Sequence, residues 1–258
     1  FEGYTGASFS ATNGVVPDCW DSYATNSNHI APHIIGSGSY HYVHGGTNAL
    51  TFYGSGYCYA ALPEFTNALS ELQVSFWMQT ESDTNGELTL GYITAEDVNF
   101  NTFTAIETYA SNKSSMVQRT TYLNNVPAAA THLVFRWFYS TQFSCCIDDV
   151  EVSLIPSCVG PTGLTATDIA STSATLSWTE HGSATAWVLQ YGTNKNFTAG
   201  TYTEATVNTT PTTNLTGLTA ESIYYARVKP ECDIEGNNWS DVISFWPTAT
   251  MEVTVNIA

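Results

Sequence analysis

The clearest pattern in this sequence is Ala174-Thr-Leu-Ser-Trp178, followed a turn later by Trp187-Val-Leu-Gln-Tyr191. Two more runs of the same kind, Tyr224-Tyr-Ala-Arg-Val228 and Val242-Ile-Ser-Phe245, follow toward the C-terminal end. β-Branched and aromatic residues dominate each run, and turn residues separate the runs. Alternation with a period of two indicates half-buried strands rather than a helix. The segment from Leu164 to Pro247 is therefore predicted to form a small β sandwich.

Two residues of this segment have the spacing of a sandwich corner. Leu218 precedes Tyr224 by six residues, which lets an inward Leu and a corner Tyr close one edge, with the phenol reaching a backbone group. At this point the segment resembles fibronectin type III domains. The resemblance implies that Trp178 is the buried strand-B Trp, that Tyr191 is the strand-C aromatic residue, and that Leu218 and Tyr224 form the tyrosine corner. It implies a fold and not a ligand.

Composition limits the function classes that need to be considered. A chain of 258 residues is long enough for one large and one small β domain. Asp and Glu number 23 against 6 Lys plus Arg, which gives a formal net charge of −17, so nucleic acid is a poor partner. No apolar run in the sequence approaches the ~20 residues of a membrane span, and its first residues lack the positively charged apolar pattern of a signal peptide. We therefore expect a mature, processed chain or an excised fragment.

The six cysteines favour disulfides and an oxidising compartment. Cys158 lies just before the predicted sandwich and Cys232 just after the strand that carries Tyr224, so we expect these two to pair. Such a bridge stabilises a domain by ~4 kcal/mol on the chain-entropy model. The pairing of the other four is left open by the sequence: Cys19, Cys58, Cys145 and Cys146. The compartment that fits is extracellular or the cell surface.

Pro and Gly residues between Ile155 and Gly163 interrupt the strand pattern and mark a domain boundary. We therefore expect a first domain over 1–155, the sandwich over 156–248 and an extra strand over 249–258. In that last segment apolar residues alternate with polar ones, at Met251, Val253, Val255 and Ile257. A strand with one apolar face needs a sheet edge to join. It is expected to pack on its own chain, to begin a further domain or to complete a neighbouring subunit.

The first domain shows strand signals throughout and no convincing helical period. The strand-like runs are Ala49–Tyr53, Leu72–Trp77, Leu88–Ile93, Phe103–Glu107, His132–Trp137 and Ile147–Val152. Many short strands over such a length predict a two-sheet jelly roll. The fold class predicted for the whole chain is thus all-β, a jelly-roll sandwich followed by a fibronectin type III-like sandwich.

Three motifs in the first domain occur in a telling order: Phe1-Glu2, His44-Gly-Gly-Thr-Asn48 and Ile147-Asp-Asp-Val150. Together they resemble the cleaved-adhesin domains of Bacteroidetes surface proteins, including the haemagglutinin regions of gingipains, and more distantly the MAM domains of animal receptors. The resemblance implies a structural calcium ion near the place where the first and last strands meet.

The residues that match this calcium site are Glu2, Asn48, Asp148 and Asp149. Calcium takes six to eight oxygen ligands, and these side chains offer carboxylate and amide oxygens. The alternative is that one Asp of the pair faces solvent and the other caps a turn. Calcium is the only cofactor that we expect.

Aromatic residues among glycines are the candidates for ligand contact. If they are exposed, Tyr40, Tyr42, Tyr53, Tyr57 and Tyr59 are expected to stack on sugar rings, and Trp20 is a further candidate contact. The alternative is that they fill the sandwich core and its edges.

Catalytic patterns are absent from the sequence: no nucleophile elbow, phosphate-binding loop or HExxH motif occurs. His29 and His33 have the i, i+4 spacing of zinc ligands, but Pro32 prevents the helix that this arrangement needs. We therefore expect no enzyme. The predicted function is adhesion at a surface through glycan or host protein. The alternative is a structural subunit of an extracellular filament or layer that pairs with its own copies through its C-terminal strand, Met251–Ala258.

Overall fold

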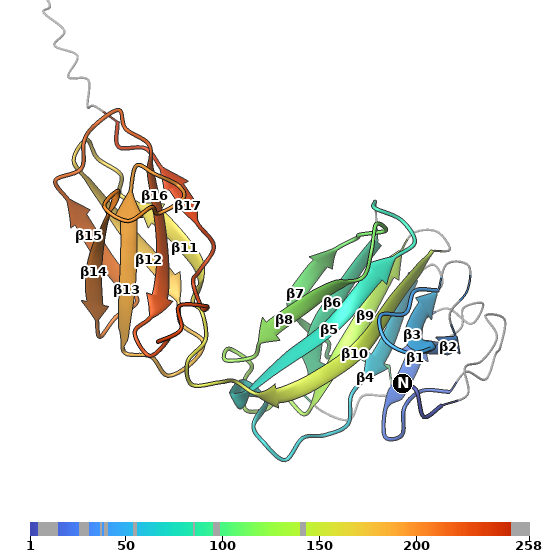
Figure 1. Ribbon diagram of the computed structural model, residues 1–258. Coiled ribbons are helices and arrows are strands. Elements are labelled where there is room, and N and C mark those ends of the chain that lie inside the picture. Colours follow the sequence, from blue (N-terminus) through green and yellow to red (C-terminus); the bar gives the residue numbers. More distant parts are fainter. Residues whose placement is uncertain are drawn as a thin grey trace, which may run out of the picture. The chain divides into compact units, whose positions relative to one another are not determined.

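The computed structural model describes residues 1–4, 15–25, 31–36, 38, 41–53, 56–84, 86–94, 99–139 and 143–248. The chain divides into two compact units, Phe1–Leu154 and Ile155–Ala258, and both are built from antiparallel strands (Figure 1). In the described part of the chain no helix is long and apolar enough to cross a membrane. The predicted all-β class is confirmed.

The first unit is a sandwich of two five-stranded sheets. The first sheet has the order β1 (Asp21–Ala24), β4 (Gly56–Ala61), β9 (His132–Tyr139), β6 (Gly86–Ile93) and β7 (Thr104–Ala110). The second sheet has the order β2 (His33–Gly36), β3 (Asn48–Tyr53), β10 (Ser144–Leu154), β5 (Leu72–Thr80) and β8 (Val117–Tyr122). A short 3-10 turn, Leu69–Glu71, precedes β5. Successive strands such as β5 and β6, or β9 and β10, lie in opposite sheets, which is the winding of a jelly roll.

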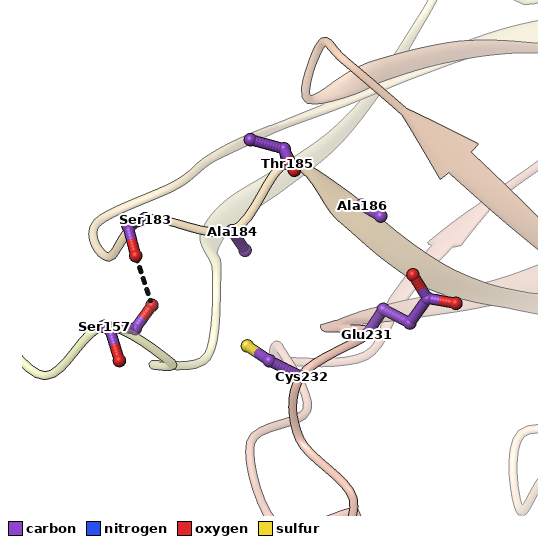
Figure 2. A pocket seen from close by; sticks show the side chains of 7 residues that line it. All are labelled: Ser157, Ser183, Ala184, Thr185, Ala186, Glu231 and Cys232. Atoms are coloured by element: carbon purple, nitrogen blue, oxygen red, sulfur yellow. Dashed lines mark hydrogen bonds between the residues drawn. The ribbon is translucent and has the colours of Figure 1, made fainter.

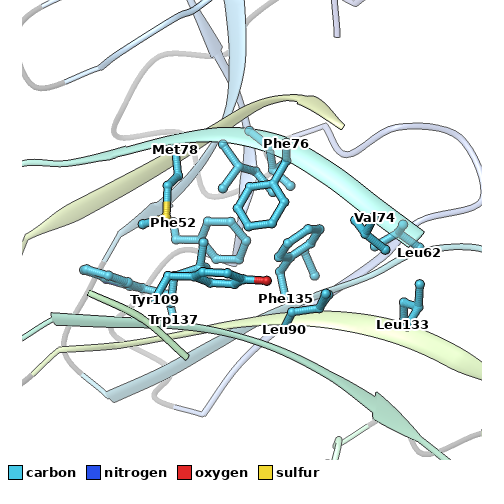
Figure 3. Close-up of a cluster of buried hydrophobic side chains, with 14 of the residues drawn as sticks. Phe52, Leu62, Val74, Phe76, Met78, Leu90, Tyr109, Leu133, Phe135 and Trp137 are labelled. Atoms are coloured by element: carbon cyan, nitrogen blue, oxygen red, sulfur yellow. The ribbon is translucent and has the colours of Figure 1, made fainter. Parts of the chain in front are cut away.

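Alternating side chains of the two sheets fill the core of the first unit. On β5 the inward residues are Val74, Phe76 and Met78, all without solvent exposure. Phe76 packs edge to face on Phe135 of β9, with ring centroids 4.9 Å apart (Figure 3). Full burial of one such side chain contributes roughly 1.5–3 kcal/mol. The outward residues of the same strands point away from this core and can make other contacts.

The second unit packs a three-stranded sheet on a four-stranded one. The sheets are β11 (Thr162–Thr167), β12 (Ser173–Thr179) and β15 (Thr212–Thr216), and β14 (Tyr202–Asn208), β13 (Ala186–Gly192), β16 (Tyr224–Pro230) and β17 (Ile243–Phe245). Trp178 and Trp187 meet in the core with ring centroids 5.6 Å apart. The Tyr224 hydroxyl accepts a hydrogen bond of 3.0 Å from the Thr219 backbone N–H, so the predicted tyrosine corner is present.

The cysteines divide between the two units. Cys158 and Cys232 form the disulfide that we expected, with Cα atoms 6.0 Å apart. The expectation of further disulfides is wrong for the first unit, whose described cysteines are free thiols. Cys145 points into the core and Cys146 to the outer face of β10, beside Thr51, because neighbours on a strand face opposite ways.

Candidate functional site

The loop His44–Asn48 collects the four residues predicted to bind calcium. Asp148 and Asp149 lie in β10, where adjacent side chains would normally point to opposite faces. The pairing of β10 with β5 shifts between Asp148 and Glu151, and Asp149 has a φ of 46°. This irregularity is a β-bulge, which re-aims a side chain. Both Asp carboxylates consequently reach the same loop.

The two Asp residues hold the start of the loop. Asp148 is 1% exposed, and its Oδ2 accepts hydrogen bonds from the His44 and Gly45 backbone N–H groups at 2.9 and 3.1 Å. Its Oδ1 accepts from the Asp149 N–H at 2.8 Å. Asp149 Oδ2 lies 2.7 Å from His44 Nδ1, and the His44 ring stacks on Trp77 at 3.6 Å. The start of the loop is thereby fixed to β10 and β5.

Glu2 holds the other end of the loop. Its Oε2 accepts from both the N–H and the hydroxyl of Thr47 at 2.9 Å, and its Oε1 accepts from the Asn48 N–H at 2.9 Å. The hydrogen bonds from the Asn48 and Thr47 backbone lower the pKa of Glu2. Gly46 has a φ of +68°, and a Cβ there would lie 2.2 Å from the Glu2 Cδ. Only glycine therefore fits between the loop and this carboxylate.

Asn48 completes the connection to the N-terminal residues. Its Nδ2 donates to the Tyr4 carbonyl at 2.8 Å and to the Phe1 carbonyl at 3.4 Å. The N-terminal segment, the loop and β10 are thus joined by side chains from all three. The predicted residues are brought together around one loop, with carboxylate oxygens facing backbone N–H groups.

The donor chemistry suits calcium, because every candidate ligand is an oxygen. The Asp148 carboxylate is buried, and it takes no part in the ion pairs of the described residues, which join His44 to Asp149 and Lys229 to Asp233. Within the same described part, no group of three or more His, Cys, Asp or Glu side chains is arranged to hold a metal ion. As described, the carboxylates act as acceptors that hold a loop.

The residues predicted to contact a ligand do not form one site. Tyr40 lies outside the described residues. The Tyr42 backbone N–H donates to Cys146 Sγ at 3.4 Å, on the outer face of the second sheet. Trp20 is half-buried and packs edge to face on Phe1 with centroids 6.1 Å apart. Among the candidates that the structure describes, only Tyr57 is exposed, at 38%, on the first sheet. Core packing thus accounts for Trp20, as the alternative expected.

The outer face of the first sheet carries a cluster that contains two of the candidate tyrosines, Tyr57 and Tyr59, together with residues that the sequence did not predict. In the strand register, Tyr59 of β4 lies opposite Arg136 of β9, and Tyr57 lies opposite Phe138. The loop between β6 and β7 adds Phe103 and Phe100. We call this set, with Tyr23 of β1, the aromatic face; its members are Tyr23, Tyr57, Tyr59, Phe100, Phe103, Arg136 and Phe138.

The aromatic face has a closed part and an open part. In the closed part Tyr59 stacks on Phe100 with centroids 5.0 Å apart, and both are nearly buried. Burial raises the pKa of the Tyr59 phenol, and the charge of Arg136 opposes that rise. In the open part Tyr57 packs on Phe138 at 4.8 Å and remains partly exposed. Solvent reaches the face at its open part.

Arg136 lies between the two parts. Its guanidinium carbon is 5.0 Å from the centre of the Tyr57 ring and 4.3 Å from that of Phe103. Such cation–π contacts favour a guanidinium held flat against aromatic rings. A sequence signal for this cluster existed: Tyr57 with Tyr59 and Arg136 with Phe138 each have the i, i+2 spacing of one strand face. The spacing alone does not show that these two strands pair.

Open depressions lie elsewhere among the described residues of the two units. One of about 380 Å³ lies beside the disulfide and is lined by Ser157, Ser183, Ala184, Thr185, Ala186, Glu231 and Cys232 (Figure 2). Another of about 480 Å³ lies at the ends of β6 and β7 beside Asp83 and Glu87. The third, of about 360 Å³, is lined mainly by Thr, Tyr and Gly residues of the second unit. None of these linings pairs a nucleophile with a general base.

The remaining predicted residues stay untested by the structure. His29 and the assembly residues Met251, Val253, Val255 and Ile257 lie outside the described residues. His33 is buried, and its Nδ1 is 3.0 Å from the Ala31 carbonyl oxygen. No zinc arrangement of histidines is present in the described segments.

Residues 160–246 match the family model of the fibronectin type III domain, and no curated protein matches the chain. Among solved structures, the K2 cleaved adhesin domain of Lys-gingipain has 16% identity and a TM-score of 0.46 over 57% of this chain and 95% of that chain. The K1 domain of Lys-gingipain from Porphyromonas gingivalis W83 has 16% identity and a TM-score of 0.46 over 54% and 93%. The FN5 domain of Drosophila Lar has 20% identity and a TM-score of 0.31 over 36% and 99%.

The strand topology and the family match together define an all-β protein of two sandwiches. Its second sandwich is a fibronectin type III domain over residues 160–246.

Proposed function

We propose that this chain is a non-catalytic adhesion protein, secreted or held at a bacterial surface, whose first unit binds carbohydrate through the aromatic face. The observation that carries the proposal is the open part of that face, where Tyr57 and Phe138 meet beside Arg136. Exposed apolar rings grouped on one surface mark interaction sites. The fibronectin type III domain then serves as a spacer.

The position of the rings supports binding over packing. The main core of the first unit lies between the sheets, and Tyr57, Phe138 and Arg136 do not belong to it. Ligand sites combine aromatic surfaces with a few polar groups that fix orientation. Tyr57 supplies a ring and a hydroxyl, and Arg136 supplies several N–H donors. Sugar rings, with one apolar face and a hydroxyl periphery, have the complementary chemistry.

Glycan-array binding by the purified chain tests this proposal. We expect retention of carbohydrate and a loss of roughly tenfold in affinity for Tyr57→Ala, because stacking area is removed. Trp246→Ala is the matched control, since Trp246 is an exposed aromatic residue of the second unit. Absence of any retained glycan, or equal binding by Tyr57→Ala and the wild type, would contradict the proposal.

We further propose that a calcium ion reinforces the loop His44–Asn48, held by Glu2, Asn48, Asp148 and Asp149. The buried Asp148 carboxylate and the all-oxygen donor set support it. A bound cation would offset the repulsion between the neighbouring carboxylates. We expect chelation to lower the melting temperature of the first unit and to leave that of the second unchanged. An unchanged melting temperature of the first unit after chelation would contradict the proposed calcium site.

A second candidate function is assembly into a filament through residues 250–258. It is supported by β7, which ends the first sheet with no described strand on its outer side and with most of its residues exposed. Unpaired edges of this kind accept added strands. Light scattering of the chain with and without residues 250–258 tests it. Large particles that vanish on truncation would favour assembly, and a monomer in both cases would exclude it.

A further inference from the structure

Arg136 is a rare type of residue in this chain. The sequence has 6 Lys plus Arg against 23 Asp plus Glu. The first unit contains only Lys113, Arg119 and Arg136. A cation placed on an outer sheet face of so acidic a protein would ordinarily be paired with one of the many carboxylates.

Arg136 has no such partner among the described residues. Within the described residues, the ion pairs shorter than 4.0 Å join His44 to Asp149 and Lys229 to Asp233. Its Nε is buried and has no hydrogen-bond partner in the described part of the chain. Glu87 lies on the same face, opposite Phe138 rather than opposite Arg136, and the two form no ion pair. The Tyr59 phenol oxygen accepts a hydrogen bond from the guanidinium, but no carboxylate of the described residues forms an ion pair with it.

Arg227 of the second unit has a similar aromatic setting, but its guanidinium also has a side-chain hydrogen-bond acceptor. Its guanidinium carbon also lies over two rings, 4.4 Å from the centre of Phe197 and 4.1 Å from that of Trp239. There, however, Nε and Nη2 both donate to Gln190 Oε1 at 2.9 and 2.8 Å. The two arginines share the aromatic setting and differ in the acceptor. In the first unit no amide oxygen of the described residues holds the Arg136 Nε in this way.

We propose that the aromatic face selects acidic carbohydrate, with a carboxylate of the sugar paired to Arg136 and the sugar ring against Tyr57. This inference rests on the carbohydrate binding proposed above. The planar fork of a guanidinium matches the two oxygens of a carboxylate, and such charge-assisted pairs are stronger than neutral hydrogen bonds. Because the net charge of −17 repels anions, selection depends on this local contact and not on the overall field.

The wild-type chain provides the first test without any variant. Binding of 3′-sialyllactose and of an oligogalacturonate is compared with binding of their methyl esters, which keep the ring and lose the charge. We expect the acid of at least one pair to bind roughly tenfold more tightly than its ester. Equal binding of acid and ester in both pairs would overturn the inference.

Variants then assign the preference to Arg136. Arg136→Met is expected to remove the difference between acid and ester, and Arg136→Lys to retain part of it, because the charge stays and the fork is lost. Lys113→Met is the matched control, since it changes the net charge equally at an exposed loop position. An acid preference that survives in folded Arg136→Met, or that falls equally in Lys113→Met, would refute the role of Arg136.

The outcomes separate this inference from the function on which it rests. If neutral sugars and esters bind as well as acids and Tyr57→Ala abolishes both, the carbohydrate function stands and the acidic selectivity fails. If no sugar of any charge binds, both fail together.

Discussion

The two units hold their N-terminal residues in place by different kinds of interaction. The second unit ties Cys158, near its first strand, to Cys232 beyond β16 by a covalent bond. The first unit ties Glu2 to Thr47 and Asn48 by hydrogen bonds to a carboxylate. A covalent closure responds to redox conditions, whereas a closure through carboxylates responds to protons and cations. The stability of each unit should therefore depend on a different property of the surroundings.

The largest expected effect breaks the covalent closure. Replacing Cys158 and Cys232 by Ser should lower the free energy of unfolding of the second unit by about 4 kcal/mol, because a loop of 74 residues regains its freedom in the unfolded chain. Hydrogen exchange read by peptide mass spectrometry reports each unit separately. Protection of the first unit should not change, since its described cysteines are free thiols. An equal loss of hydrogen-exchange protection in both units would contradict the expectation that each unit is stabilised by its own closure.

The next largest effect concerns the stability cost of replacing one glycine in each unit by alanine. Gly46 and Gly217 both have a φ near +70°, at +68° and +73°, so an Ala at either position costs about 1–2 kcal/mol of backbone strain. A Cβ at Gly217 meets nothing within 4 Å, whereas one at Gly46 meets the Glu2 carboxylate. Gly46→Ala should thus cost about 1 kcal/mol more than Gly217→Ala, through lost hydrogen bonds. Equal costs in chemical denaturation would show that Glu2 does not hold the loop.

The second unit was predictable from the sequence because its signals are local. Trp178, Trp187 and the corner Tyr224 lie in short alternating runs whose period gives their burial directly. The pairing of Cys158 with Cys232 followed from their places at the ends of this pattern. The family match over 160–246 agrees with this prediction.

The functional surface of the first unit depends on long-range pairing, which a single sequence does not contain. Tyr57 was a candidate for ligand contact on the condition that it is exposed, and it is exposed. Its partner Arg136 comes from β9 and meets it only through the register of β4 and β9. Likewise, the bulge at Asp149 that turns both Asp side chains to one loop leaves no mark in the sequence. The four residues predicted to bind calcium lie around one loop. This proximity was predictable because the three motifs that contain them were considered together.

A smaller effect concerns the thiols that the first unit leaves unbridged. Burial raises the pKa of Cys58 from an ordinary value of 9.0 to about 12. The folded state therefore keeps a proton that the unfolded state loses, and stability falls as the pH rises above 9. Linkage gives a loss of about 1 kcal/mol by pH 10.

The melting temperature of each unit between pH 8 and pH 10 checks this. The slope for the first unit should be reduced in Cys58→Ala. The bridged cysteines of the second unit do not titrate and add nothing to its slope. An unchanged slope in Cys58→Ala would exclude the thiol as the cause.

The smallest effect tests the carboxylate closure itself. Backbone hydrogen bonds from Asn48 and Thr47 lower the pKa of Glu2 below its ordinary value of 4.5. The folded state releases this proton more readily than the unfolded state, so the contribution to stability is present above pH 4.5 and is lost as the pH falls through the lowered value. Because Glu2 is exposed, solvent screening keeps the contribution small.

In Glu2→Gln the melting temperature of the first unit should therefore fall less steeply between pH 5 and pH 3 than in the wild type. Glu64→Gln, a change at another exposed carboxylate, should leave the wild-type slope in place. The second unit, closed by its disulfide, should show the same acid response in all three chains. Equal slopes for the first unit in all three would mean that the N-terminal residues are held by the Asn48 contacts to Phe1 and Tyr4 and not by the Glu2 carboxylate.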